Sequence, residues 1–204
     1  MDTATLSRRP LVKKILAGAD DTLLVVAGLG SPNWDITEAG DRPLNMPLWG
    51  AMGGTVPMAL GLALAQPGRR VLAITGDGDM LMSLGALATV AMQAPANLAI
   101  VVLDNGKFGE TGNQATHTSP RGQGPVDSGA GTDLAMIARG CGIADSATVT
   151  AEREVEGLVA DARRKAGPVF RVAKIKAEKL PFVMPPQDGA HLKDRFRQAL
   201  LGTT

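Results

Sequence analysis

The chain contains almost no cysteine and few aromatic residues, and each shortage excludes a class of protein. Its 204 residues include one cysteine, Cys141, so the chain cannot form an internal disulfide or a cysteine-ligated zinc or iron–sulfur site by itself. A lone cysteine of this kind is typical of a small buried hydrophobic position. Tyrosine is absent and aromatic residues make up 3% of the chain, so the core must be built from Leu, Val, Ala and Met.

An excess of charge of one sign and long apolar runs are lacking as well. The net charge is +1 at pH 7, and no basic stripe with interleaved aromatics is present, which argues against a nucleic-acid partner. No apolar run reaches the roughly 18 residues that a membrane span needs, and the polar first residues lack the apolar centre of a signal peptide. We therefore expect a cytoplasmic protein with neither membrane nor nucleic acid as a partner.

What the sequence does contain is an alternation of apolar runs and helical patterns. Short apolar runs predict buried strands at residues 22–28, 70–75, 97–104, 146–150 and 168–175. Helical patterns occur at residues 5–18, 55–66, 79–93, 131–142 and 152–165. The alternation predicts an α/β fold with a single doubly wound, mostly parallel sheet and helices on both faces. We expect one domain over residues 1–180, followed by a C-terminal arm and short helix over residues 181–204.

The segment from residue 28 to residue 54 is rich in proline and glycine. It is longer than an ordinary connection between elements of a compact domain. We therefore interpret it as a candidate functional loop.

Polar residues directly follow two of the predicted strands. Asp77 and Gly78 come after the strand at 70–75, and Asn105 comes after the strand at 97–104. If these strands are neighbours, both polar tips face one crevice at the carboxyl ends of the sheet, where such folds bind ligands.

The chemistry of this crevice favours a phosphate and a cation together. The glycines at 76 and 78 allow a phosphate to approach the backbone, and the helix that begins near Asp79 offers unpaired amides to an anion. A carboxylate such as that of Asp77 beside a phosphate requires a cation between them. Mg²⁺ prefers the oxygen ligands that this site offers.

At this point the chain resembles the thiamine diphosphate (ThDP) enzymes, whose cofactor-anchoring motif is Gly-Asp-Gly followed by an Asn at the spacing of Asp77 and Asn105. Residues 47–65 resemble the family's loop beneath the aminopyrimidine ring, and residues 104–114 resemble the loop that closes over the diphosphate and substrate. The resemblance extends over most of the chain. The most similar members are the pyrophosphate-binding (PP) beta subunits of sulfopyruvate decarboxylase and the C-terminal domain of phosphonopyruvate decarboxylase.

The resemblance implies a role for each matching residue. Mg²⁺ would be ligated by the side chains of Asp77 and Asn105 and by the backbone carbonyl of Lys107. The cofactor itself would contact Gly50, Ala51, Met52, Gly76, Asp77, Gly78, Asp79, Asn105, Lys107, Phe108 and Gly109. Met52 would act in catalysis by holding the cofactor in its bent form, while Thr111, Gln114 and His117 would contact the substrate. His117 is a second catalytic candidate, and the Lys107 side chain is a candidate for recognising an anionic group.

Three positions depart from the family pattern. Asp79 stands where many relatives have Ser or another small residue, so we expect its side chain to turn away from the diphosphate or to cap the helix. Asp104 replaces the first residue of an Asn pair, which we expect to be harmless because the second Asn is the ligand. Asn113 interrupts a Gly-Gly pair in the loop expected to touch the substrate, so the identity of the 2-oxo acid stays open.

The resemblance also implies a partner chain. ThDP catalysis needs a glutamate on a second, pyrimidine-binding (PYR) domain. This chain has room for only one α/β domain of that size, which is the PP domain. We expect an α₂β₂ assembly with a PYR-domain subunit, which releases CO₂ and an aldehyde from a small anionic 2-oxo acid such as sulfopyruvate or phosphonopyruvate.

Other functions stay open on the sequence alone. A subunit of a 2-oxoacid:ferredoxin oxidoreductase has a similar loop but would need clusters on other chains, and an acetohydroxyacid-synthase-like fragment would differ in product. A nicotinamide-binding Rossmann domain is disfavoured because Pro32 and Asn33 interrupt the pattern that begins at Gly28 and Gly30. A non-catalytic scaffold subunit is disfavoured because Asp77 and Asn105 are both present.

Overall fold

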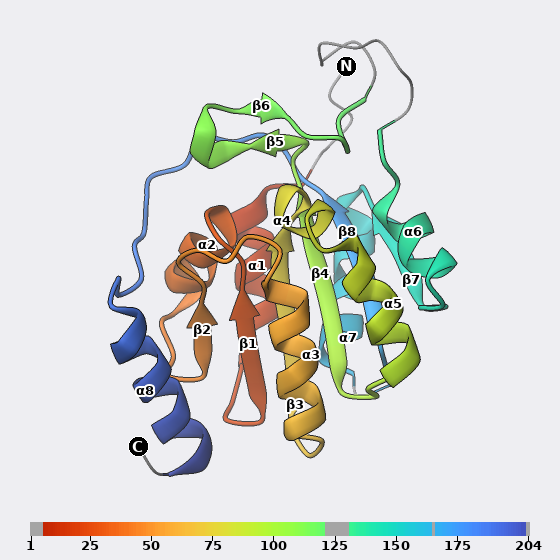
Figure 1. Cartoon of the computed structure of the whole chain (residues 1–204). Helices are drawn as coiled ribbons and strands as arrows, with labels where there is room; N and C mark the ends of the chain where they lie inside the picture. The colour runs from red at the N-terminus through yellow and green to blue at the C-terminus, as the bar shows by residue number, and fades with distance from the viewer. Residues whose placement is uncertain (1–5, 121–130, 165, 203–204) are drawn as a thin grey trace.

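The computed structural model describes residues 6–120, 131–164 and 166–202, in which six parallel strands form one sheet in the order β2-β1-β3-β4-β8-β7 (Figure 1). The strands are β1 (Leu23–Ala27), β2 (Asn45–Pro47), β3 (Arg70–Gly76), β4 (Leu98–Asp104), β7 (Ser146–Val149) and β8 (Val169–Lys174). A separate antiparallel pair, β5 (Lys107–Phe108) and β6 (Gln114–Ala115), lies beyond the carboxyl ends of the strands.

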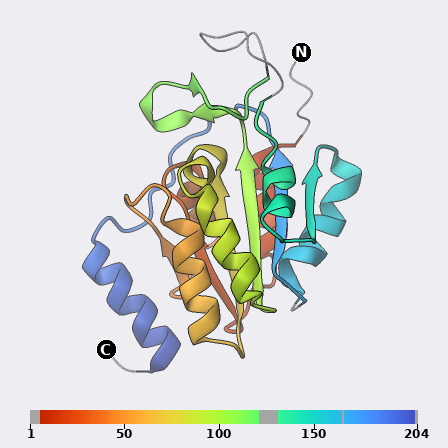
Figure 2. The same ribbon diagram turned by 45° about the vertical axis from the view of Figure 1, so that its right-hand side comes forward.

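Helices cover both faces of the sheet. One face carries α1 (Arg8–Leu16), α2 (Ser31–Ala39) and α7 (Val155–Arg163). The opposite face carries α3 (Thr55–Ala65), α4 (Asp77–Leu81), α5 (Leu84–Gln93) and α6 (Leu134–Gly140) (Figure 2). Short 3-10 turns occur at Gly109–Thr111 and Glu152–Glu154. The last helix, α8 (Gly189–Leu201), packs beside the edge strand β2.

The strands are continuous apolar runs because both of their faces are covered. In β3, Val71 and Ala73 belong to the core under α3 and α5, whereas Leu72 and Ile74 belong to the core under α1 and α7. Every residue of β4 is buried. The sheet confirms the predicted doubly wound α/β fold. β3 and β4 pair directly, so Asp77 and Asn105 follow neighbouring strands.

The segment at residues 28–54 is more regular than we expected. It contains the helix α2, which begins directly after Gly30 and tolerates Pro32 in its first turn, and the three-residue edge strand β2. Its other prolines and glycines lie at the ends of these elements or in the connections between them, as Gly30, Gly40 and Pro47 do.

The predicted helix at residues 79–93 is two helices. The first, α4, starts at Asp77, and the chain leaves the helical conformation at Ser83, whose φ is −131°, before α5 begins. Neither Gly nor Pro occupies the break, and the apolar residues keep their helical spacing through it, so the sequence predicts one continuous helix.

The C-terminal helix is joined to the core. In α8, Leu192 and Phe196 are buried, and Phe196 belongs to the same apolar cluster as α3. None of the helices in the described part of the chain is long and apolar enough to cross a membrane.

Candidate functional site

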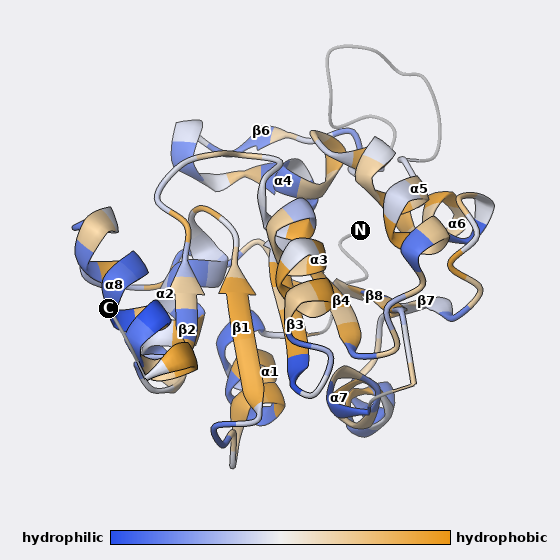
Figure 3. Cartoon of the chain, turned by 60° about the horizontal axis from the view of Figure 1, so that its bottom comes forward, coloured by the Kyte–Doolittle hydropathy of each residue, from blue (hydrophilic) through white to orange (hydrophobic). Residues whose placement is uncertain are grey.

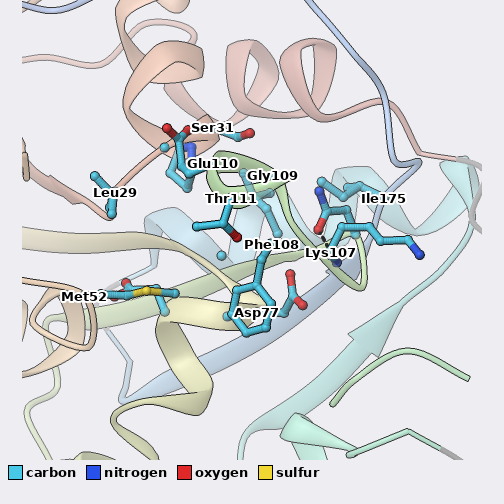
Figure 4. Close-up of a pocket in the computed structure, with 17 residues that line it drawn as sticks. Leu29, Ser31, Met52, Asp77, Lys107, Phe108, Gly109, Glu110, Thr111 and Ile175 are labelled. Carbon is cyan, nitrogen blue, oxygen red and sulfur yellow. Dashed lines mark hydrogen bonds between the residues drawn. The ribbon is translucent and has the colours of Figure 1, made fainter. Parts of the chain in front are cut away.

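A cavity lies at the carboxyl ends of β1, β3 and β4, beneath the β5–β6 hairpin (Figure 4). After β1 the chain continues into α2 on one face of the sheet, and after β3 it continues into α4 on the other face. This change of direction opens the crevice in which α/β sheets bind ligands. The cavity is lined by residues 29–32, 76–79, 105 and 107–111, together with Met52, Leu103 and Ile175.

Asp77 lies at the bottom of this cavity and is 1% exposed. Its Oδ2 accepts hydrogen bonds from the hydroxyls of Thr116, at 2.5 Å, and Thr118, at 3.0 Å. Burial, followed by the nearby charge of Asp104, raises the pKa of the Asp77 carboxyl from 3.8 to about 6, against the opposing effect of the two threonines. The carboxylate is therefore destabilised in the free protein, and a bound cation would relieve this.

Asp104 lies behind Asp77 and interacts with its surroundings more extensively than the sequence suggested. It is buried, forms an ion pair with Lys174, and accepts hydrogen bonds from the Thr118 hydroxyl at 2.8 Å and the Gly106 amide at 3.1 Å. Thr118 thus lies between the two carboxylates, and its one hydroxyl proton is donated to either of them. Asp104 therefore influences the site indirectly, because its charge raises the pKa of Asp77.

Asn105 and Lys107 form a tight turn at the end of β4. The Asn105 Oδ1 accepts a hydrogen bond from the Lys107 amide at 2.9 Å, which fixes the side chain at the mouth of the cavity. The Lys107 side chain extends away from Met52 and from the carboxylate of Asp77 (Figure 4). Its backbone, and not its ammonium group, faces the cavity.

Gly78 forms a cradle that a side chain would fill. An ideal Cβ on Gly78 would lie 2.5 Å from Phe108 Cε1 and 3.3 Å from Met52 Cε. Glycine here lets the backbone stay open to the cavity between an aromatic ring and a thioether. The cradle, with oxygen ligands on Asp77 and Asn105, fits a diphosphate and a hard cation.

The described residues contain no cluster of three or more His, Cys, Asp or Glu side chains that could hold a metal. A metal at this site would therefore need the Asn105 amide oxygen and backbone carbonyls besides Asp77. Those are ligands that suit Mg²⁺ and not zinc.

Met52 is carried by a loop with unusual backbone geometry. Ala51 and Gly53 both have positive φ, 52° and 88°, and the Gly54 amide donates to the Ala51 carbonyl at 2.6 Å. Met52 is 38% exposed and lines the cavity, whereas Gly50 and Ala51 lie outside the lining.

The loop after β5 brings only part of the predicted substrate set into the cavity. Thr111 lines it, and Gln114 binds back onto Thr111 through two hydrogen bonds of 2.8 and 2.7 Å. His117 is exposed, because Thr116 and Thr118 on either side of it point inward to Asp77. The roles of Gln114 and His117 stay predictions.

The segment at residues 28–54, which the sequence indicated as a candidate functional loop, contributes to the cavity through the residues directly after β1. Leu29, Gly30 and Ser31 line it, and Gly30, with φ of 81°, lies so close to Glu110 that a Cβ there would be 2.9 Å from Glu110 Oε1. No individual residue of this turn was predicted as a site residue, although Gly28 and Gly30 directly after an apolar strand were an available signal.

Comparisons with known proteins point to one family. Residues 32–172 match the family described as "Thiamine pyrophosphate enzyme, C-terminal TPP binding domain". Sulfopyruvate decarboxylase subunit beta of Methanocaldococcus jannaschii is 36% identical over 149 residues, covering 73% of this chain and 73% of that protein. The subunit beta of Methanococcus maripaludis is 32% identical over 198 residues, covering 96% of this chain and 98% of that protein.

Two further proteins extend the comparison. Phosphonopyruvate decarboxylase of Streptomyces viridochromogenes is 32% identical over 192 residues, which are 94% of this chain and 45% of that enzyme. Benzoylformate decarboxylase from Polynucleobacter necessarius superposes with a TM-score of 0.65 over 89% of this chain and 35% of its own. At 19% identity this last likeness supports the fold alone.

Proposed function

Because this chain belongs to the thiamine pyrophosphate enzyme family, we propose that it is the PP subunit of a split, ThDP- and Mg²⁺-dependent 2-oxo acid decarboxylase. The observation that carries the proposal is that Asp77 and Asn105 follow neighbouring strands and line one cavity. The backbone of Gly78, which has no side chain, lines the same cavity. Relatives that are named sulfopyruvate decarboxylase subunit beta and match nearly end to end support the reaction class.

The chain's own residues bind and orient the reacting groups. Asp77 and Asn105, with the Lys107 carbonyl, would hold Mg²⁺, and the amides of Gly78 and Asp79 would receive the diphosphate. ThDP supplies the electron-accepting chemistry that decarboxylation of a 2-oxo acid requires.

Met52 and the loop after β5 enclose the site. Met52 projects into the cavity where it can prop the cofactor, and Phe108 packs over Gly78 at the same wall. The Thr116 and Thr118 hydroxyls tie the loop to Asp77, which keeps bulk water from the metal ligand. Thr111 is the cavity residue best placed for a substrate; Gln114 and His117 would have to turn inward to reach it.

A partner chain is supported by the outer surface of α3 and α5. The α3 sequence contains no charged residue, and its outward positions include Met58 and Leu64, 43% and 48% exposed. Met82 and Met92, before and within α5, are 64% and 83% exposed. Figure 3 shows α3 largely without the hydrophilic colour of α7 and α8. An apolar surface of this kind suits a subunit interface, and we propose that it receives the PYR-domain subunit.

The reaction is tested with the chain and its partner together. This chain is co-expressed with the neighbouring open reading frame, and CO₂ and aldehyde release are measured from sulfopyruvate, phosphonopyruvate and pyruvate with ThDP and Mg²⁺. We expect turnover of one of the three only when both chains are present, and its loss in Asp77→Ala. Full turnover by this chain alone, or a ThDP-loaded complex that decarboxylates none of them, would contradict the proposal.

The interface is tested by charge. Leu64→Glu on α3 should prevent co-purification of the partner, while Ala160→Glu on the exposed side of α7 should not affect it. Equal recovery of the partner with both variants would exclude this surface.

A further inference from the structure

The carboxylate of Asp79 points away from the cavity and into the protein. Asp79 is 5% exposed, and its Oδ2 accepts hydrogen bonds from the Thr55 hydroxyl, at 2.6 Å, and from the Thr75 hydroxyl. Its Oδ1 accepts a hydrogen bond from the backbone amide of Gly53. A single side chain therefore joins the end of β3, the start of α3, the first turn of α4 and the loop that carries Met52.

The carboxylate has little freedom to move. An ideal Cβ on Gly28 would lie 2.7 Å from Asp79 Oδ2 and 2.8 Å from Thr55 Oγ1, so the backbone at the end of β1 closes directly over this group. Two hydroxyls hold one oxygen, which fixes the direction of the other oxygen toward Gly53. Hydrogen bonds to a buried carboxylate are among the stronger ones in proteins.

Besides Asp79, the loop has few anchors: the Gly54 amide donates to the Ala51 carbonyl, and Gly53 lies against Met82. Gly50 has nothing within 4 Å of an ideal Cβ, Ala51 is exposed, and the φ values of Ala51 and Gly53 lie in the left-handed region. For Ala51, which is not a glycine, such a conformation persists only where its surroundings determine it. Asp79 fixes the loop conformation through its hydrogen bond with the amide of Gly53, the residue after Met52.

We propose that Asp79 is a positioning residue that holds the Met52 loop, residues 50–54, at a fixed place relative to the diphosphate turn, residues 76–79. The inference rests on the proposed function, since the two segments would bind the ring and diphosphate ends of ThDP. The side chain of Asp79 acts through Gly53 and touches neither end. It aligns the two halves of the cofactor site before the cofactor arrives, and a preorganised site binds more tightly because less ordering is left to the ligand.

Two ligands, of which one contacts a larger part of the site, distinguish a positioning role of Asp79 from a general effect on protein stability. Inorganic pyrophosphate with Mg²⁺ uses the diphosphate turn alone, whereas ThDP with Mg²⁺ uses the turn and the Met52 loop. Affinities for both are measured by calorimetry with the full chain, in complex with its partner where the two co-purify. The variants are Asp79→Ser, which is too short to reach Gly53, and Asp79→Asn, which keeps an oxygen for Gly53 and can donate to both hydroxyls.

In Asp79→Ser we expect ThDP to bind roughly ten- to a hundredfold more weakly while pyrophosphate changes by less than about threefold. Asp79→Asn should keep both affinities within about threefold of the original. Hydrogen exchange at the Gly53 amide should accelerate in the Ser variant and not in the Asn variant. Asp133→Ser, at the exposed start of α6, is the matched control and should change none of these values.

Equal loss of both ligands in Asp79→Ser, or unchanged ThDP affinity in that variant, would overturn the inference. Should the Ser variant fail to fold, Thr55→Val serves in its place, because it removes one hydroxyl that directs the carboxylate. A ratio of ThDP to pyrophosphate affinity that is unchanged in Thr55→Val would equally overturn it. Failure of the unmodified protein to bind either ligand would instead refute the proposed function.

Discussion

Asp77→Asn should stabilise the ligand-free protein while weakening its binding of Mg²⁺ and ThDP, because it removes the charge of the ligand and keeps an oxygen. The raised pKa of Asp77 means that the folded protein binds a proton at this carboxyl more tightly than the unfolded chain does. The unfolding free energy of the ligand-free protein therefore contains a contribution that is present below pH 4 and is lost as the pH rises to about 6. Asparagine is neutral at every pH, so it removes that loss.

The size of the effect follows from the pKa values. The rise in the Asp77 pKa from 3.8 to about 6 means that the folded protein loses about 3 kcal/mol of unfolding free energy above pH 6. Asparagine has nearly the same shape, and its amide oxygen can still accept from the Thr116 and Thr118 hydroxyls. We therefore expect Asp77→Asn to be more stable than the original protein by up to about 3 kcal/mol at pH 7.5, and by far less at pH 4.5.

The assay is urea unfolding of the ligand-free protein at these two pH values, followed by titration with ThDP and Mg²⁺. Asp21→Asn is the control, since the Asp21 side chain is exposed and does not line the cavity. A variant that is no more stable than the original at pH 7.5, or equally stabilised at both pH values, would refute the account of Asp77. Mg²⁺-dependent ThDP binding as tight as in the original protein would refute the assignment of Asp77 as the charged ligand.

Two further substitutions test the support of the site. Gly78→Ala should leave the unfolding free energy within about 1 kcal/mol of the original, since the displaced Phe108 ring is the end of a side chain, but it should weaken ThDP binding measured by calorimetry. The control Gly157→Ala, in open space on α7, should leave binding unchanged. Equal effects of the two substitutions would contradict the role of Gly78 in the cofactor site. Lys174→Met should lower the unfolding free energy by about 2 to 3 kcal/mol in urea, because it leaves the buried Asp104 without its cation. Adding Asp104→Asn should restore most of that loss, and no recovery would mean that Lys174 contributes by packing alone.

The sequence was most informative where one physical requirement decides the residue type. Strands covered on both faces must be apolar along their length, so β3 and β4 were evident, and their pairing placed Asp77 and Asn105 at one edge of the sheet. The same reasoning indicated the fold class without any knowledge of relatives.

Less could be predicted where tertiary contacts decide. The break at Ser83 carries no Gly or Pro, so local pattern alone could not separate α4 from α5. The outward direction of His117 follows from the inward bonds of its two threonine neighbours, which are formed with a residue far away in sequence. The inward direction of Asp79 depends on Gly53 and Thr55, from a different part of the chain.

The most direct test of the central claim is the position of the metal. The protein, with its partner where one co-purifies, is crystallised with ThDP and Mn²⁺ in place of Mg²⁺, and anomalous scattering locates the cation. We predict a single site within bonding distance of an Asp77 carboxylate oxygen, the Asn105 side-chain oxygen and the Lys107 carbonyl, with the diphosphate on its other side. A cation held at Asp104 or Glu110, or a diphosphate bound away from Gly78, would contradict the account.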